Sequence, residues 1–135
     1  MSKVVLITGG SSGIGKSIGE FLINKNYKVY GTSRKPENCK DSKFPIVALD
    51  VTKKETISTC ISEVLKNEGK LDVLINNAGV GITGPIEEIP EEEIKNNFET
   101  NFFGPINVIK AVLPQMRKQE SGLIINITSI AGYMG

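Results

Sequence analysis

The stretch that decides the fold is Thr8-Gly-Gly-Ser-Ser-Gly-Ile-Gly15, near the start of the 135-residue chain. It follows the apolar run Val4–Ile7, which the sequence predicts to be a buried strand. A helix is predicted to begin by about Gly13, so the glycines occupy a turn between a strand and a helix. The general dinucleotide fingerprint GxGxxG does not match this stretch, so each glycine has to be judged by what the turn needs there.

The glycines and serines of this turn have separate predicted roles. Gly9 permits a tight turn out of the strand, Gly13 lets the backbone approach a phosphate without a Cβ, and Gly15 lets the helix pack closely. The free N–H groups of the helix N-terminus would bind a pyrophosphate, and Ser11 and Ser12 add hydroxyl donors. The alternative is a plain glycine-rich turn that binds no ligand.

Short apolar runs alternate with segments of helical periodicity along the chain. Most runs are continuous, which is typical of parallel strands that are covered on both faces. The runs are Val4–Ile7, Val29–Tyr30, Ile46–Leu49, Leu71–Ile75 and Leu123–Ile127. Their order predicts an α/β fold in one domain, residues 1–135: a Rossmann-type doubly wound parallel sheet, truncated after the fifth strand.

Three apolar stripes predict helices that pack on this sheet. The stripes consist of Ile14, Ile18, Phe21 and Leu22; of Ile57, Ile61, Val64 and Leu65; and of Phe102, Ile106, Ile109, Leu113 and Met116. Thr52 is placed to cap the second helix, which is expected to start near Lys53. The polar stretch Arg34–Pro45 contains two prolines and is expected to be mostly loop.

The composition is that of an ordinary soluble globular protein. Apolar residues make up 39%, charged residues 23%, and the net charge is +1, so nothing points to nucleic acid or a membrane as a partner. No signal peptide or transmembrane run is seen. Cys39 and Cys60 lack metal-site spacing, so we expect free thiols, a cytoplasmic location and no metal. With no histidine, Ser-His-Asp hydrolysis is excluded from this segment.

The end of the second predicted strand discriminates between dinucleotides. An NAD site carries a carboxylate there for the ribose 2′-hydroxyl, whereas Gly31-Thr-Ser-Arg-Lys35 contains no acid. Arg34 and Lys35 can hold a 2′-phosphate instead, and a guanidinium offers bidentate geometry for it. The alternative is two solvated loop cations. The pattern favours NADP(H) over NAD(H).

Several ordered motifs together resemble the short-chain dehydrogenase/reductase family over essentially the whole chain. Thr8–Gly15 is similar to its TGxxxGIG motif, Asn76–Gly79 to its NNAG motif, and Asp50-Val51 to the acidic step that contacts adenine. The stretch Gly79–Ile86 resembles the subgroup of 17β-hydroxysteroid and retinol dehydrogenases. The cofactor-binding residues that this implies are Gly9, Ser11, Ser12, Gly13, Ile14, Gly15, Arg34, Asp50, Val51, Asn77, Ala78 and Gly79.

The resemblance also implies an oxidoreductase that transfers hydride between a nicotinamide and a small-molecule alcohol or carbonyl substrate. Ser129 matches the family's active-site serine, which hydrogen-bonds the substrate oxygen. Asn101 matches its helix asparagine, which holds a water in a proton relay. Asn101 shares a predicted helix face with Ile94 and Phe98, so its amide is expected to be buried and to need partners. Pro105 has no N–H, which frees the Asn101 carbonyl for a water.

The family's Tyr-x-x-x-Lys pair does not occur in this sequence. Tyr133 is only four residues past Ser129 and has no lysine partner. We therefore expect the chain alone to be inactive, as the N-terminal portion of a longer enzyme. We also expect Leu123–Ile127 to form an apolar edge that a homo-oligomer or a missing C-terminal portion covers. The alternatives are a non-catalytic dinucleotide-binding module and an interaction fragment that binds no nucleotide.

Overall fold

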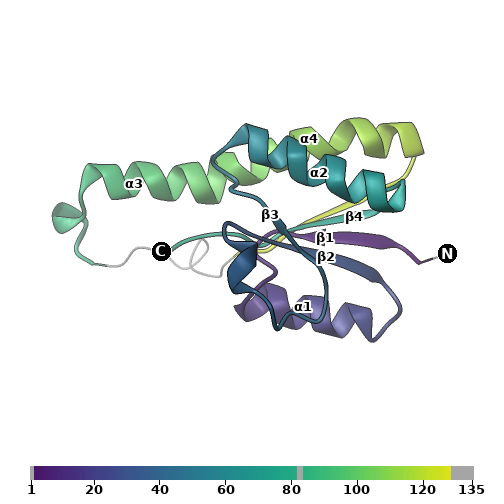
Figure 1. The fold of residues 1–135 in the computed structure, drawn as a ribbon. Helices are drawn as coiled ribbons and strands as arrows, with labels where there is room; N and C mark the ends of the chain where they lie inside the picture. Colours follow the sequence, from purple (N-terminus) through teal and green to yellow (C-terminus); the bar gives the residue numbers. More distant parts are fainter. Residues whose placement is uncertain (1, 82–83, 129–135) are drawn as a thin grey trace.

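Figure 1 shows a computed structural model of the chain, which describes residues 2–81 and 84–128. Its centre is a parallel five-stranded sheet with the order β3-β2-β1-β4-β5, so the predicted α/β doubly wound sheet is confirmed. The elements are β1 (Val4–Ile7), α1 (Gly13–Ile23), β2 (Lys28–Ser33), η1 (Pro36–Asn38), β3 (Ile46–Ala48), α2 (Lys54–Glu68), β4 (Val73–Asn76), η2 (Ile86–Glu88), α3 (Glu91–Phe98), η3 (Glu99–Phe103), α4 (Gly104–Gln119) and β5 (Leu123–Asn126).

The strand order places the functional edge of the sheet. The chain runs outward from β1 to β2 and β3, and then returns to the other side of β1 with β4. Leu6 in β1 lies between Tyr30 of β2 and Leu74 of β4. In open sheets of this kind, ligands bind outside the carboxyl ends of the strands where the order reverses. Here that point lies between β1 and β4.

Helices cover the two faces of the sheet unequally. Figure 1 shows α2 and α4 on one face and α1 on the other. The core between the sheet and the α2–α4 pair includes Leu6, Leu74 and Val108, all fully buried. The smaller core on the α1 side contains Phe44, which the loop between β2 and β3 supplies. The ring of Phe44 thus helps to cover the part of this sheet face that has no second helix over it.

The predicted packing face of α1 is wrong in two of its four positions. Ile14 and Phe21 are 65% and 60% exposed, whereas Gly15 and Gly19 are buried. A Cβ at Gly19 would lie 2.4 Å from the ring of Phe44, so the helix comes close to the sheet side only because this position has no side chain. Apolar periodicity does not count glycines and therefore missed the face on which the helix packs.

The predicted stripe of α4 is also partly wrong. Phe102 and Ile106 are 54% and 38% exposed. The residues that face the core are spaced by four and begin two residues later: Gly104, Val108, Val112 and Met116. The π-helical segment η3 precedes them, and Pro105 lies in the first turn of α4, where it supplies no N–H. The wider π turn changes the phase of the helix face after Phe102, so a stripe drawn from Phe102 at 3.6 residues per turn fails here. Ile106 lies within the regular helix, but two residues before Val108, and so on the opposite side from the packed face.

The predicted stripe of α2 is confirmed, but its predicted cap is wrong. Ile57, Ile61 and Val64 are buried. Lys53 occupies the N-cap position of α2, and no side chain caps the helix. The hydroxyl of Thr52 instead donates to the Asp50 carboxylate over 2.6 Å.

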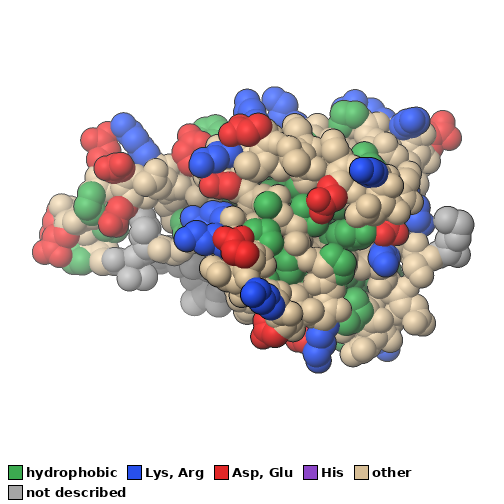
Figure 2. All heavy atoms as spheres, viewed as in Figure 1, with side chains coloured by type: hydrophobic (Ala, Val, Ile, Leu, Met, Phe, Trp, Pro, Cys, Tyr) green, Lys and Arg blue, Asp and Glu red, His purple; other side chains and the backbone are tan. Residues whose placement is uncertain are grey.

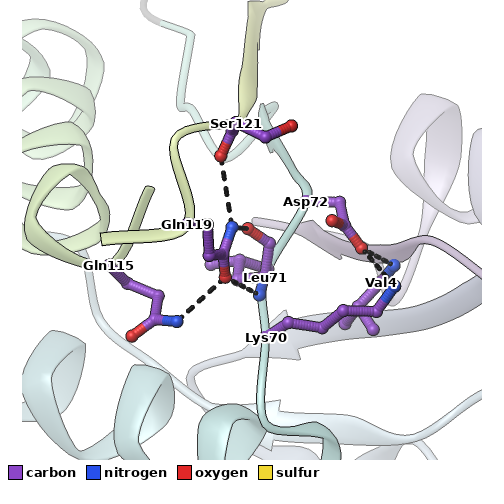
Figure 3. Close-up of polar contacts among 7 residues, drawn as sticks. All are labelled: Val4, Lys70, Leu71, Asp72, Gln115, Gln119 and Ser121. Atoms are coloured by element: carbon purple, nitrogen blue, oxygen red, sulfur yellow. Dashed lines mark hydrogen bonds and ion pairs between the residues drawn. The ribbon is translucent and has the colours of Figure 1, made fainter. Parts of the chain in front are cut away.

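A side-chain amide joins the end of α4 to the start of β4 (Figure 3). Gln119 accepts a hydrogen bond from the N–H of Leu71 and donates one to its carbonyl, both at 2.9 Å. It thereby pairs with Leu71 as a neighbouring strand residue would. Gln115 donates to the same Gln119 oxygen at 2.9 Å and fixes its orientation.

The helix α3 projects beyond the sheet (Figure 1), and Figure 2 shows acidic side chains gathered on this projection. Its first turn contains Glu91, Glu92 and Glu93, and Lys95 pairs with Glu91 at 3.3 Å. Carboxylates in the first turn of a helix offset its positive N-terminal dipole. The acidic cluster therefore has a local structural reason.

Replacing Gly19 with alanine tests the close approach of α1. We expect Gly19→Ala to lower the free energy of unfolding by about 1–3 kcal/mol, because the new methyl overlaps the Phe44 ring. Ser17→Ala, at an exposed position of the same helix, is the control and should be neutral or slightly stabilising. Urea unfolding measures both, and a Gly19→Ala variant as stable as wild type would show that the ring moves aside.

A second test uses the carboxylate of Asp72, which accepts from the N–H of Val4 at 2.8 Å and pairs with Lys70 at 3.1 Å (Figure 3). Burial acts to raise the pKa of Asp72, but these two contacts outweigh it and lower the pKa below its usual value. We expect the stability advantage of wild type over Asp72→Asn to be complete above about pH 4. It should shrink as the pH falls through the lower folded-state pKa; an advantage that does not vary with pH would contradict this.

Candidate functional site

A cavity of about 750 Å³ lies at the carboxyl edge of the sheet. Its walls come from the loops after β1, β2, β3 and β4, and from the junction of α3 and η3. The lining residues are Gly9, Ser11, Ser12, Thr32, Ser33, Arg34, Leu49, Asp50, Val51, Thr52, Asn77, Ala78, Gly79, Val80, Asn96, Glu99 and Thr100. The cavity therefore lies at the edge where the strand order predicts a ligand.

Two buried threonine hydroxyls hold the loops of this cavity together. The hydroxyl of Thr8 accepts hydrogen bonds from the N–H groups of Asn77 and Ala78, at 2.9 and 3.0 Å. The hydroxyl of Thr32 accepts from the N–H of Gly9 at 3.2 Å. Both threonines are 1% exposed, so these polar groups have no access to solvent as a replacement partner. The loops after β1, β2 and β4 are thereby fixed relative to one another.

The glycines of the first loop have the conformations that such a turn requires. Gly9 and Gly13 have φ values of +66° and +54°, in the region where an L side chain is strained. Apart from its chain neighbours and the backbone of its own helix, no atom lies within 4 Å of a Cβ built at Gly13, so the space beside its backbone is open to a ligand. At Gly15 a Cβ would lie 2.5 Å from the Asn77 side chain and from the Gly9 carbonyl oxygen. Gly15 therefore permits α1 to pack under the loops.

The N-terminus of α1 is electrostatically suited to an anion. Its first backbone N–H groups have no acceptor within the helix, as at every helix start. No acidic residue lies in the first turn of α1, and the N-cap Ser12 makes no side-chain capping bond. The positive end of this helix is therefore left without an acidic partner in its own turn, in contrast to α3 with its three glutamates.

Arg34 and Asp50 bring opposite charges to the end of the cavity near β2 and β3. Burial acts to raise the pKa of Asp50, but hydrogen bonds from the N–H and hydroxyl of Thr52, with the charges of Lys53 and Arg34, lower it overall. Asp50 is thus a carboxylate at neutral pH, held in place by Thr52. The Arg34 side chain is exposed and carries the positive charge on the cavity wall.

Asn101 differs from its sequence-based expectation. Its side chain is exposed, because η3 turns it away from the core rather than into an apolar stripe. The amide has partners nonetheless: its oxygen accepts from the N–H of Val80 at 2.8 Å, and its nitrogen donates to the Val80 carbonyl at 2.6 Å. Asn101 therefore holds the segment that follows β4 and does not itself line the cavity.

The structure brings most of the predicted cofactor residues to one cavity. Nine line it: Gly9, Ser11, Ser12, Arg34, Asp50, Val51, Asn77, Ala78 and Gly79. Gly13, Ile14, Gly15 and Asn101 lie outside the lining set, with Gly15 buried beneath the loop and Ile14 exposed. Ser129 lies outside the described residues. The sequence analysis did not identify Thr8 and Thr32 as residues that hold the loops together, although Thr8 directly follows one predicted strand and Thr32 lies two residues past another.

The wall from the α3–η3 junction was also missed. Asn96, Glu99 and Thr100 add a part of the cavity wall that comes from the helical layer, and a helix stripe gave no signal for them. Among residues 2–81 and 84–128, no helix combines the length and hydrophobicity needed to cross a membrane. No group of three or more potential metal ligands is found in that same part of the chain.

Comparison with known proteins adds relatives to this geometry. A 3-ketodihydrosphingosine reductase of Bacteroides thetaiotaomicron is 48% identical over 134 residues, which is 98% of this chain and 49% of that protein. Human retinol dehydrogenase 8 is 37% identical, over 98% of this chain and 46% of that protein. The chain thus spans about half the length of the curated relatives it matches.

Solved structures agree in fold. A short-chain dehydrogenase from Streptomyces avermitilis has a TM-score of 0.91 and 40% identity, covering 98% of this chain and 51% of its own. ElxO, solved with NADP bound, has a TM-score of 0.88 and 35% identity, covering 100% of this chain and 58% of its own.

The family model described as short chain dehydrogenase matches residues 3–135, the same stretch that forms the sheet, the glycine turn and the cavity. This chain therefore belongs to the short-chain dehydrogenase family.

Proposed function

We propose that this chain is the dinucleotide-binding domain, residues 1–135, of an NADP(H)-dependent oxidoreductase. The dinucleotide, when bound, supplies or accepts the hydride that is exchanged with an alcohol or carbonyl substrate. The observation that carries the proposal is the meeting of Arg34 with the glycine turn in one cavity, at a strand end that has no carboxylate.

The chemistry of the lining residues fits a dinucleotide phosphate. The free N–H groups at the start of α1 and the open space beside Gly13 suit the pyrophosphate. Ser11 and Ser12 line the cavity at the same helix start. Asp50 and Val51 would contact the adenine end of the dinucleotide. Asn77, Ala78 and Gly79 would contact the part of it that lies near β4.

The presence of Arg34 favours a dinucleotide whose ribose carries a 2′-phosphate over one whose ribose has a free 2′-hydroxyl. Ser33 and Arg34 line the cavity where an NAD site would need an acid to accept from the ribose. A guanidinium binds a phosphate through two parallel hydrogen bonds. The NADP bound in the ElxO structure supports the same choice.

Catalysis is proposed to need residues in addition to those of this sequence. Ser129 would hydrogen-bond the substrate oxygen, and Asn101 would serve the proton relay. The family's tyrosine and lysine, which move the proton and hold the nicotinamide ribose, have no match in this sequence. We therefore propose that the chain alone has no turnover.

The substrate and partners are proposed at the level of chemical class. The names of two relatives, a 3-ketodihydrosphingosine reductase and a retinol dehydrogenase, support a ketone or alcohol substrate. The strand β5 lies at the sheet edge, and Leu123 and Ile125 on it, with Ile127 just after it, are exposed. This exposed apolar edge supports the proposal that a second copy of the chain, or a C-terminal portion, packs against β5. The free thiols of Cys39 and Cys60 accord with a cytoplasmic location.

Removing the Arg34 guanidinium tests the cofactor proposal. We expect Arg34→Ala to weaken binding of NADPH and of 2′,5′-ADP by about tenfold to a hundredfold, because a charged hydrogen-bond donor to the 2′-phosphate is lost. NADH has no such phosphate, so its affinity should not change. Fluorescence and calorimetric titrations measure all three. Lys40→Ala, an exposed cation of the same loop, is the control.

Two outcomes would contradict the proposal. If wild type binds neither NADPH nor NADH, the chain is not a dinucleotide-binding domain. If Arg34→Ala and Lys40→Ala weaken NADPH equally, the loop acts only through its summed charge and Arg34 makes no specific contact.

Turnover is tested in a longer natural protein. The coding DNA beyond codon 135 is read first, for an open frame that encodes Tyr-x-x-x-Lys. In that protein we expect Ser129→Ala to lower kcat by about a hundredfold, because a donor to the reacting oxygen is removed. Ser121→Ala, an exposed position before β5, is the control. An unchanged kcat, or a stop codon at 136, would leave a non-catalytic dinucleotide-binding module.

A further inference from the structure

The main chain of Val80 is held by two asparagines from the helical layer. Asn101 bonds its N–H and its carbonyl, at 2.8 and 2.6 Å. Asn97, in the last turn of α3, donates a second hydrogen bond to the same carbonyl at 3.0 Å. A carbonyl oxygen has two lone pairs, so both donors are accommodated.

The bond from Asn97 joins two walls of the cavity. Val80 belongs to the wall that follows β4, and Asn96, beside Asn97 in sequence, belongs to the wall from the α3–η3 junction with Glu99 and Thr100. The segment around Val80 has no regular secondary structure of its own. Its position relative to α3 therefore depends on side-chain hydrogen bonds.

Asn97 adds a constraint that Asn101 does not supply. Asn101 lies in the π-helical segment η3, whereas Asn97 lies in the regular helix α3 that precedes it. Two attachment points, one on each side of the change in helix geometry, prevent α3 from pivoting about the Asn101–Val80 pair. The Asn97–Val80 bond therefore fixes how the α3–η3 part of the cavity wall is placed relative to the segment after β4.

We infer that Asn97 is a positioning residue that fixes this placement and thereby favours binding of the half of a dinucleotide that is remote from the 2′-phosphate. The inference rests on the proposed function for its ligand. Arg34 and Asp50 lie after β2 and β3, on the far side of β1 from Val80, so the adenosine end is independent of the Asn97 bond.

The test compares Asn97→Asp with wild type. The aspartate has the same shape but no donor, and its charge faces the Val80 carbonyl. We expect NADPH affinity to fall between about threefold and tenfold, and the affinity for 2′,5′-ADP to stay within about twofold. A merely structural role would weaken both ligands alike. Asn24→Asp, an exposed position at the end of α1, is the control, and Asn97→Ala separates loss of the donor from the added charge.

Hydrogen exchange in the free protein gives a readout that needs no ligand. We expect the peptide containing Val80 to exchange faster in Asn97→Asp and Asn97→Ala, with the β1 and β2 peptides unchanged. Unchanged exchange at Val80, or equal loss of NADPH and 2′,5′-ADP affinity, would overturn the inference. Failure of wild type to bind NADPH would instead overturn the proposed function, while the exchange data still decide whether Asn97 holds Val80.

Discussion

The rest of the site depends on the hydrogen bonds that the hydroxyl of Thr8 accepts. This hydroxyl accepts two backbone N–H groups, those of Asn77 and Ala78, and so joins the carboxyl ends of β1 and β4 where the strand order reverses. A buried acceptor shared by two donors leaves both N–H groups orphaned if it is removed. The side chain of Asn77 then reaches the Gly9 carbonyl at 3.2 Å, which ties the glycine turn to the same point.

Much of the fold was accessible from sequence because its main signals are local. Continuous apolar runs found all five strands, and the α2 stripe held because that helix is regular and has side chains on its packed face. The faces of α1 and α4 were misassigned for two different physical reasons. Glycine packs without contributing hydrophobicity, as at Gly19, and a π-helical turn changes the phase before Val108. Neither effect is visible to a fixed period.

The residues of the site also fall into those that the sequence predicted and those that it did not. Loop residues that directly follow strands, such as Gly9, Arg34 and Asp50, were predictable because strand ends converge at one edge. The wall that contains Glu99 and Thr100 was not, because it depends on how α3 and η3 are attached to Val80. That attachment is made by side-chain amides of Asn97 and Asn101, whose partners lie 17 and 21 residues away in the sequence. A sequence motif gives a residue's type, but it does not show which distant main-chain group the side chain will bond.

The π-helical segment η3 also limits how this region can change in length. An α-helix advances by about 100° per residue, so deleting one residue from η3 would rotate α3 by roughly that angle relative to α4. With Val108 and Val112 still packed on the sheet, Asn97 would then face away from Val80. Insertions and deletions between Asn97 and Val108 are therefore expected to be selected against, whichever side chains occupy the positions between them. The number of residues between Asn97 and Val108 is thus constrained by the geometry of the site, independently of the identity of those residues.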